Sequence, residues 1–306
     1  MPQPASPDNR LRTKSERQIK RRETGAAYLF LAPYLALLCM FGVFPVFYAF
    51  GLSFFDTIEG VFWGVTNYTT VLGDFRLPRS AGNVLLFTAQ WVTMTIIGVS
   101  VLSLMLDAIP RRLATTLRTI FFLPGAVISS ALVVLWLFVL DPTVSPFRPI
   151  LHLAGWDTLQ SLVVGLGYAT VFAIMSYFAT SGGWIVVIGG ALSSLPTEVI
   201  EAARVDGAKP YQIALRIKLP MIWRSIVLMG ILSFAAGIQI FVEPQLFSLA
   251  GAQFAQPDWS LNQLAFSYAF QMGDFGASAA LSTMLVMVSV TIALVIIFVT
   301  KFYKMD

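Results

Sequence analysis

Six long stretches without a charged residue constrain what this chain can fold into. They span residues 24–55, 80–106, 119–140, 158–197, 225–242 and 275–300. A helix needs about 20 mostly apolar residues to cross the hydrocarbon core of a bilayer. Only 12% of the chain is charged, whereas a soluble domain has about 25%. The sequence therefore predicts an all-α integral membrane protein.

The fourth stretch, 158–197, is long enough for two helices, and the positions of the basic residues decide how it is read. If it crosses the membrane once, near 163–187, then 17 of the 20 Lys and Arg residues fall on one side. A second crossing would move the basic segment 198–224 to the opposite side. Because cytoplasmic loops carry an excess of Lys and Arg, we expect six transmembrane helices with both termini in the cytoplasm. Ser181-Gly182-Gly183 and Gly189-Gly190 are expected to break the fourth helix.

Three parts of the chain follow from this reading. Residues 1–24 form a cytoplasmic basic tail that meets anionic lipid, and 25–55 form the first transmembrane helix. The first apolar stretch is longer than the 7–15 residues of a signal peptide, so we expect it to be retained. Residues 80–301 form a core of five helices. The net charge of +4 is spread between apolar stretches, which argues against nucleic-acid binding.

Between the fourth and fifth spans the sequence predicts a short helix, a turn and a second short helix. Pro196 and Pro210 each suit the first turn of a helix, and Ser194 is the expected cap of the first one. Gly207 is expected to end that helix in a left-handed conformation.

The first of these short helices is amphipathic. Apolar and charged side chains fall on separate faces at helical spacing: Pro196, Val199, Ile200 and Ala203 on one, and Glu198, Glu201 and Arg204 on the other. From the residues alone, an ordinary connector on the membrane surface and a docking element for a partner both fit this pattern.

Three short motifs in the segment resemble a known loop. Glu201-Ala202-Ala203, Asp206-Gly207-Ala208 and Ile217-x-Leu219-Pro220 match the EAA loop of the permease subunits of ATP-binding-cassette (ABC) importers at the expected spacing. The resemblance implies a type I ABC importer transmembrane fold. It also implies that residues 194–220 dock on a separate ATPase subunit. The contact residues it implies are Glu201, Ala202, Ala203, Asp206, Gly207, Ile217, Leu219 and Pro220. Ala214-Leu215 departs from the pattern, because many relatives have an aromatic residue there.

Other segments look like the carbohydrate-uptake branch of the family, the maltose and glycerol-phosphate type. They are Gly64-Val65-Thr66-Asn67-Tyr68, Arg118-Thr119-Ile120-Phe121-Phe122-Leu123-Pro124 and Phe241-Val242-Glu243-Pro244. This resemblance implies a sugar or polyol phosphate as substrate. It further implies a second, different permease subunit, two ATPase subunits that bind ATP and Mg, and an extracytoplasmic solute-binding protein. The expected location is the bacterial cytoplasmic membrane.

Several classes of site are missing from the sequence. It contains no G-x-x-x-x-G-K-[ST] phosphate loop, and its single histidine, His152, lies in a predicted external loop. We therefore expect no catalytic residues, no metal and no cofactor on this chain. Ion-driven carriers usually need charged groups within their spans, and none lies in the middle of a span here. An ATP-independent secondary carrier or channel and an intramembrane enzyme are the alternatives.

Polar and aromatic side chains at membrane depth are candidates for a substrate path. Tyr177, Gln239 and Glu243 have the hydrogen-bonding and aromatic groups that sugars bind. Hydrogen bonding between helices would explain the same residues equally well.

Overall fold

The computed structural model describes residues 28–127, 129–250 and 256–299. By its internal contacts the chain divides into two compact units, residues 1–52 and 53–306. The predicted basic tail, both termini and the end of the predicted core at residue 301 lie outside the described residues.

The first unit contains one described helix, Tyr28–Leu52, which is 25 residues long and has a mean hydropathy of 2.2. A π-helical turn, η1 (Cys39–Val43), interrupts it before α2 (Phe44–Leu52). Its large apolar side chains are exposed, as expected of a helix solvated by lipid. The helix corresponds to the predicted first transmembrane helix, residues 25–55.

The second unit is also helical, and within the described ranges its only β-type pairing is an isolated bridge between Phe55 and Phe62. Its elements are α3 (Thr66–Gly73), α4 (Arg76–Asp107), α5 (Arg111–Phe122), η2 (Leu123–Ala126), α6 (Ser129–Leu140), α7 (Arg148–Leu153), α8 (Leu159–Leu166), α9 (Tyr168–Ser193), α10 (Thr197–Val205), α11 (Pro210–Ile213), η3 (Ala214–Lys218), α12 (Leu219–Met221), α13 (Trp223–Ile238), α14 (Val242–Ala250), α15 (Leu261–Phe266), η4 (Ser267–Gln271) and α16 (Phe275–Val299).

Five segments of the described chain are long and apolar enough to cross a membrane. They are 28–52, 76–107, 168–193, 223–250 and 275–299. The predicted third span, 119–140, is instead a bent pair: the helix ending at Ala126 and α6 lie at 101° to one another. Counting the bent pair as one crossing gives the six that the sequence predicts.

The prediction that glycines break the fourth span is wrong. α9 runs without interruption through both glycine pairs, from Tyr168 to Ser193. Gly182 lies where a neighbouring backbone approaches: a Cβ there would be 2.1 Å from the Phe121 carbonyl oxygen. At Gly189 a Cβ would be 3.0 Å from the Arg118 guanidinium carbon. These glycines therefore permit close helix packing, which is a common role of small residues in membranes.

The interruption lies in the fifth span instead. α13 ends at Ile238 and α14 begins at Val242, so the backbone from 239 to 241 leaves the helix. The carbonyl oxygen of Gln239 accepts a 2.8 Å hydrogen bond from Asn262 Nδ2. Non-helical backbone at membrane depth needs such a partner or a water-filled cavity.

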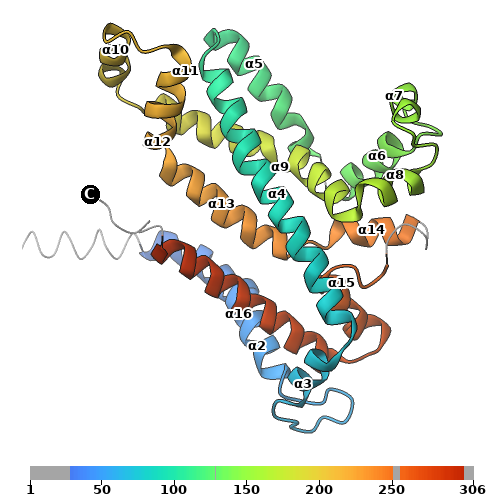
Figure 1. Cartoon of the computed structure of the whole chain (residues 1–306). Helices are drawn as coiled ribbons and strands as arrows, with labels where there is room; N and C mark the ends of the chain where they lie inside the picture. The colour runs from blue at the N-terminus through green and yellow to red at the C-terminus, as the bar shows by residue number, and fades with distance from the viewer. Residues whose placement is uncertain (1–27, 128, 251–255, 300–306) are drawn as a thin grey trace, which may run out of the picture. The chain divides into compact units, whose positions relative to one another are not determined.

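α4 is the central helix of the second unit and packs along both α9 and α13 (Figure 1). α16 packs against α3, α15 and η4, near the start of α4. α10, α11 and α12 lie near the other end of α4, where that helix finishes (Figure 1). The two ends of α4 therefore carry different structures: connecting loops at its beginning and the 194–220 segment at its end.

A polar cluster ties the loops together at the beginning of α4. Asp74 accepts hydrogen bonds from Arg76 (2.6 Å to Oδ2) and from the Tyr268 hydroxyl (2.5 Å). The hydrogen-bonded Arg76 guanidinium holds the pKa of Asp74 at about 2, against the opposing effect of burial. Burial and the hydrogen bond to Asp74 raise the pKa of Tyr268 to about 12. The cluster keeps its charge state across the physiological pH range and fixes η4 to the start of α4.

Candidate functional site

The segment 194–220 begins with a short helix whose start differs from the prediction in two details, the positions of Pro196 and Ser194. α10 follows Pro196, which precedes its first residue and supplies no side-chain cap. Ser194, the predicted cap, donates its hydroxyl backward to the carbonyl oxygen of Ala191 at 2.8 Å. It therefore helps to end α9 rather than to start α10. Glu198 lies in the first turn of α10, where a negative charge is favourable to the helix dipole.

The turn after α10 forms as the sequence predicts. Gly207 has φ of 80°, a left-handed conformation that costs glycine little. The N–H of Ala208 donates to the Ala203 carbonyl oxygen at 3.0 Å, which closes the end of α10. Pro210 then begins α11, and the Gln212 side chain accepts the N–H of Lys209 at 2.8 Å.

The eight predicted contact residues occupy two neighbouring parts of the segment. Five of them, 201–203 and 206–207, lie on α10 and its turn, where all except the partly covered Ala203 are exposed. The other three, Ile217, Leu219 and Pro220, lie in η3 and α12, just before α13. α10 has no buried residue, and its Val205 side chain is 87% exposed. A helix this short is marginal without tertiary contacts, so this surface is suited to a partner.

One ionic contact joins the segment to α4, and sequence reasoning missed it. The Lys218 ammonium group forms an ion pair with the Asp107 carboxylate, and the two side chains are 17% and 20% exposed. Asp107 is the last residue of α4. The partners are 111 positions apart, so no local pattern could have paired them.

The three predicted path residues are not brought together by the structure. Tyr177 is a residue of α9 and packs against α4. Its hydroxyl would be 2.5 Å from a Cβ placed on Gly98 of α4. Gln239 is exposed at the interruption of the fifth span. Glu243 lies in the first turn of α14 and lines a cavity of about 20 Å³ with Ser129 and other residues, which is room for about one water molecule.

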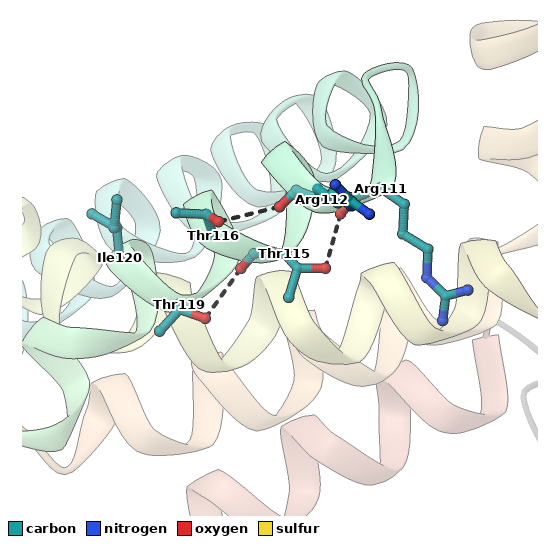
Figure 2. A pocket seen from close by; sticks show the side chains of 6 residues that line it. All are labelled: Arg111, Arg112, Thr115, Thr116, Thr119 and Ile120. Atoms are coloured by element: carbon teal, nitrogen blue, oxygen red, sulfur yellow. Dashed lines mark hydrogen bonds between the residues drawn. The ribbon is translucent and has the colours of Figure 1, made fainter.

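A separate open groove of about 800 Å³ follows the outer side of α5 (Figure 2). Arginines and threonines line most of it: Arg111, Arg112, Thr115, Thr116, Thr119 and Ile120. The threonine hydroxyls donate to carbonyl oxygens one turn back, for example Thr115 to Arg111 at 2.9 Å. Their hydrogens are thus used within the helix, and the groove shows no convergent polar site.

The described residues contain no group of three or more His, Cys, Asp or Glu side chains placed to hold a metal ion. His152, the single histidine, lies beside Asp157, with 2.7 Å between Nδ1 and Oδ1. Both side chains are at least a third exposed. This pair joins the last turn of α7 to the connection before α8 and is remote in sequence from the segment 194–220.

Comparison with known proteins identifies the family. The model of the inner membrane component of binding-protein-dependent transport systems matches residues 101–304. This chain belongs to that family and is an ABC importer permease, a transport subunit rather than an enzyme. Membership favours the importer over the carrier, channel and enzyme alternatives that the sequence left open.

Relatives and solved structures agree over nearly the whole chain. The trehalose/maltose transport system permease protein of Thermococcus litoralis is 25% identical over 97% of this chain and 99% of its own length. The alpha-glucoside transport system permease protein of Rhizobium meliloti is 26% identical over 87% and 79%. A bacterial ABC transporter involved in alginate import has a chain with a TM-score of 0.76 and 17% identity, covering 94% of this chain and 98% of that one. The last comparison shows the shared fold.

Proposed function

We propose that this permease carries a sugar or a related polyol phosphate across the bacterial cytoplasmic membrane by alternating access. The named relatives that transport trehalose, maltose and alpha-glucosides support this substrate class. A permease for sn-glycerol-3-phosphate in Brucella abortus is 29% identical over 60% of this chain, which supports a polyol phosphate as the second substrate class. In this proposal both termini face the cytoplasm, as the distribution of basic residues favours.

The proposed assembly contains more subunits than this chain. A second, different permease would complete the pathway, two ATPase subunits would bind ATP and Mg, and an extracytoplasmic binding protein would deliver the sugar. A solved relative of the same fold was crystallised with a periplasmic protein bound to an alginate pentasaccharide. Loaded binding protein and ATP would each favour one state of the permease, which is the differential binding that any population shift needs.

The segment 194–220 is the proposed contact with the ATPase. The observation that carries this is the mostly exposed α10, which has no buried residue of its own and bears Glu201, Ala202 and Ala203. Gly207 sets the direction of the chain after it, and Ile217, Leu219 and Pro220 connect it to α13. ATP-driven closure of the ATPase dimer would then move this segment.

The proposed substrate path passes the interruption of the fifth span. Gln239 begins this interruption and Glu243 lies just after it, in the first turn of α14; an interrupted helix suits a polar cavity. Tyr177 would support the path from α9, through its packing against α4.

A pull-down of the chain from native membranes tests the coupling contact. Gly207→Ala and Glu201→Ala are expected to lose most of the co-purifying ATPase, because the first strains the turn and the second removes a charged contact. Gly155→Ala is the matched control for the first, since Gly155 has φ of 84° and, like Gly207, no atom within 4 Å of an added Cβ. Equal ATPase recovery with Gly207→Ala and Gly155→Ala would contradict the proposed contact.

A further inference from the structure

Lys218 and Asp107 join the coupling segment, residues 194–220, to the end of α4. Both side chains are about four-fifths enclosed, so their attraction is screened less by salt than that of a surface pair. Removing one partner would leave the other charge partly buried and uncompensated. The pair is thus a firm attachment between two parts of the chain that are far apart in sequence.

The packing around this pair is incomplete. A cavity of about 400 Å³ separates the segment from the end of α4, lined by Leu104, Asp107, Ala108, Arg204, Ala208, Pro210, Ile213, Ala214 and Lys218. Ile213 is the residue of the segment that is buried, at 5% exposure. Beside this gap, Leu195 of the segment packs on an apolar cluster that includes Leu106 of α4, and the ion pair adds a charged attachment between the segment and that helix.

A displacement at the C-terminal end of α4 can be passed along this helix to the helices packed against it. α4 is a continuous helix of 32 residues, and it touches its neighbours closely at two glycines. An added Cβ would be 2.5 Å from the Tyr177 hydroxyl at Gly98, and 3.2 Å from the Trp91 ring at Gly237. Tightly packed helices move as rigid bodies because close-packed interiors transmit strain.

We infer that the Lys218–Asp107 ion pair is the link through which movement of the coupling segment reaches α4. This inference rests on the proposed contact between that segment and the ATPase. In it, Lys218 and Asp107 are positioning residues that touch neither ATP nor sugar. The segment's other connections are the apolar packing of Leu195 and the buried Ile213 and the backbone turns into α9 and α13, which include the non-helical Ile222 (φ −99°, ψ 10°).

Spin-label distances in the assembled importer test the link. In a Cys39→Ser background, nitroxides would be attached at Met105, near the end of α4, and at exposed Arg216. The distance between them would be measured in lipid nanodiscs without nucleotide and again after trapping with Mg-ATP and vanadate. The wild-type distance should stay constant, because the link moves both positions together. In Lys218→Met and Asp107→Asn the distance should shift or broaden on trapping. The double variant Asp107→Lys/Lys218→Asp should restore the wild-type result.

The controls separate this inference from the function on which it rests. Arg112→Met, which removes an exposed cation of α5, should behave as wild type. Single variants that retain the ATPase and show the wild-type distances would overturn the link. Loss of the ATPase from Lys218→Met that the double variant does not restore would make Lys218 a docking residue, which also overturns the link but leaves the coupling contact intact. Failure of the wild type to retain an ATPase would remove the proposed coupling function itself.

Discussion

The adjacent glycines Gly182 and Gly183 differ sharply in the space that the fold leaves for a side chain. A Cβ on Gly182 would lie 2.1 Å from the Phe121 carbonyl oxygen and 2.6 Å from the Phe122 Cα, both backbone atoms. A Cβ on Gly183 would meet nothing within 4 Å. The sequence shows two equivalent glycines, and only the approach of α5 to α9 distinguishes them.

Gly182→Ala is therefore expected to destabilise the protein by about 1–3 kcal/mol or more, the usual range for overpacking. Gly183→Ala should be neutral or slightly stabilising, since alanine is the better helix former. The fraction of detergent-solubilised protein that stays monodisperse after heating measures both. Equal thermal stability of the two variants would show that α5 and α9 do not approach as described.

Local sequence patterns predicted the conformation of residues that depend only on their immediate neighbours in the chain. Gly207 and Pro210 were predicted correctly because a left-handed turn and a helix start each have a preferred residue type. The pairing of Lys218 with Asp107 has no such signal, since it depends on how α4 and η3 meet in space. Ser194 failed as a cap because its hydroxyl had an alternative acceptor one turn back in α9.

At the scale of elements, composition identified the spans but not their interruptions. Charge-free length placed α9 and α16 well, because length and polarity are what a bilayer requires. The same information could not show that the stretch 119–140 bends, or that span five breaks at 239–241 while α9 does not. Glycine in a membrane helix serves both kinks and close packing, and the two uses look the same in sequence.

The interruption of span five gives a prediction about the substrate path. Gln239→Ala is expected to raise the sugar concentration for half-maximal uptake by about 2–10-fold, the effect of one lost hydrogen bond. Basal ATP hydrolysis should not change, because Gln239 is distant in sequence from the coupling segment. Gln160→Ala, at an exposed position of α8, is the control in the same uptake assay. An unchanged half-saturating concentration in Gln239→Ala would remove Gln239 from the path.

At the scale of the whole molecule, the two ends of α4 have different roles in the second unit. At its beginning, the Asp74–Tyr268 hydrogen bond fixes the loops between spans. At its end, the exposed segment 194–220 is attached through Lys218. An importer needs both properties: a stable scaffold around the pathway and a surface that an ATPase can move. The family match over residues 101–304 covers most of this unit.

The most direct test of the account is sugar uptake by the assembled importer in proteoliposomes, with and without ATP on the ATPase side. Radiolabelled trehalose, maltose and glycerol phosphate would be offered with the binding protein present. At least one of these should accumulate only when ATP is supplied, and Gly207→Ala should abolish the accumulation while Gly155→Ala should not. Uptake at the same rate without ATP would contradict the account and indicate a carrier that works without an ATPase.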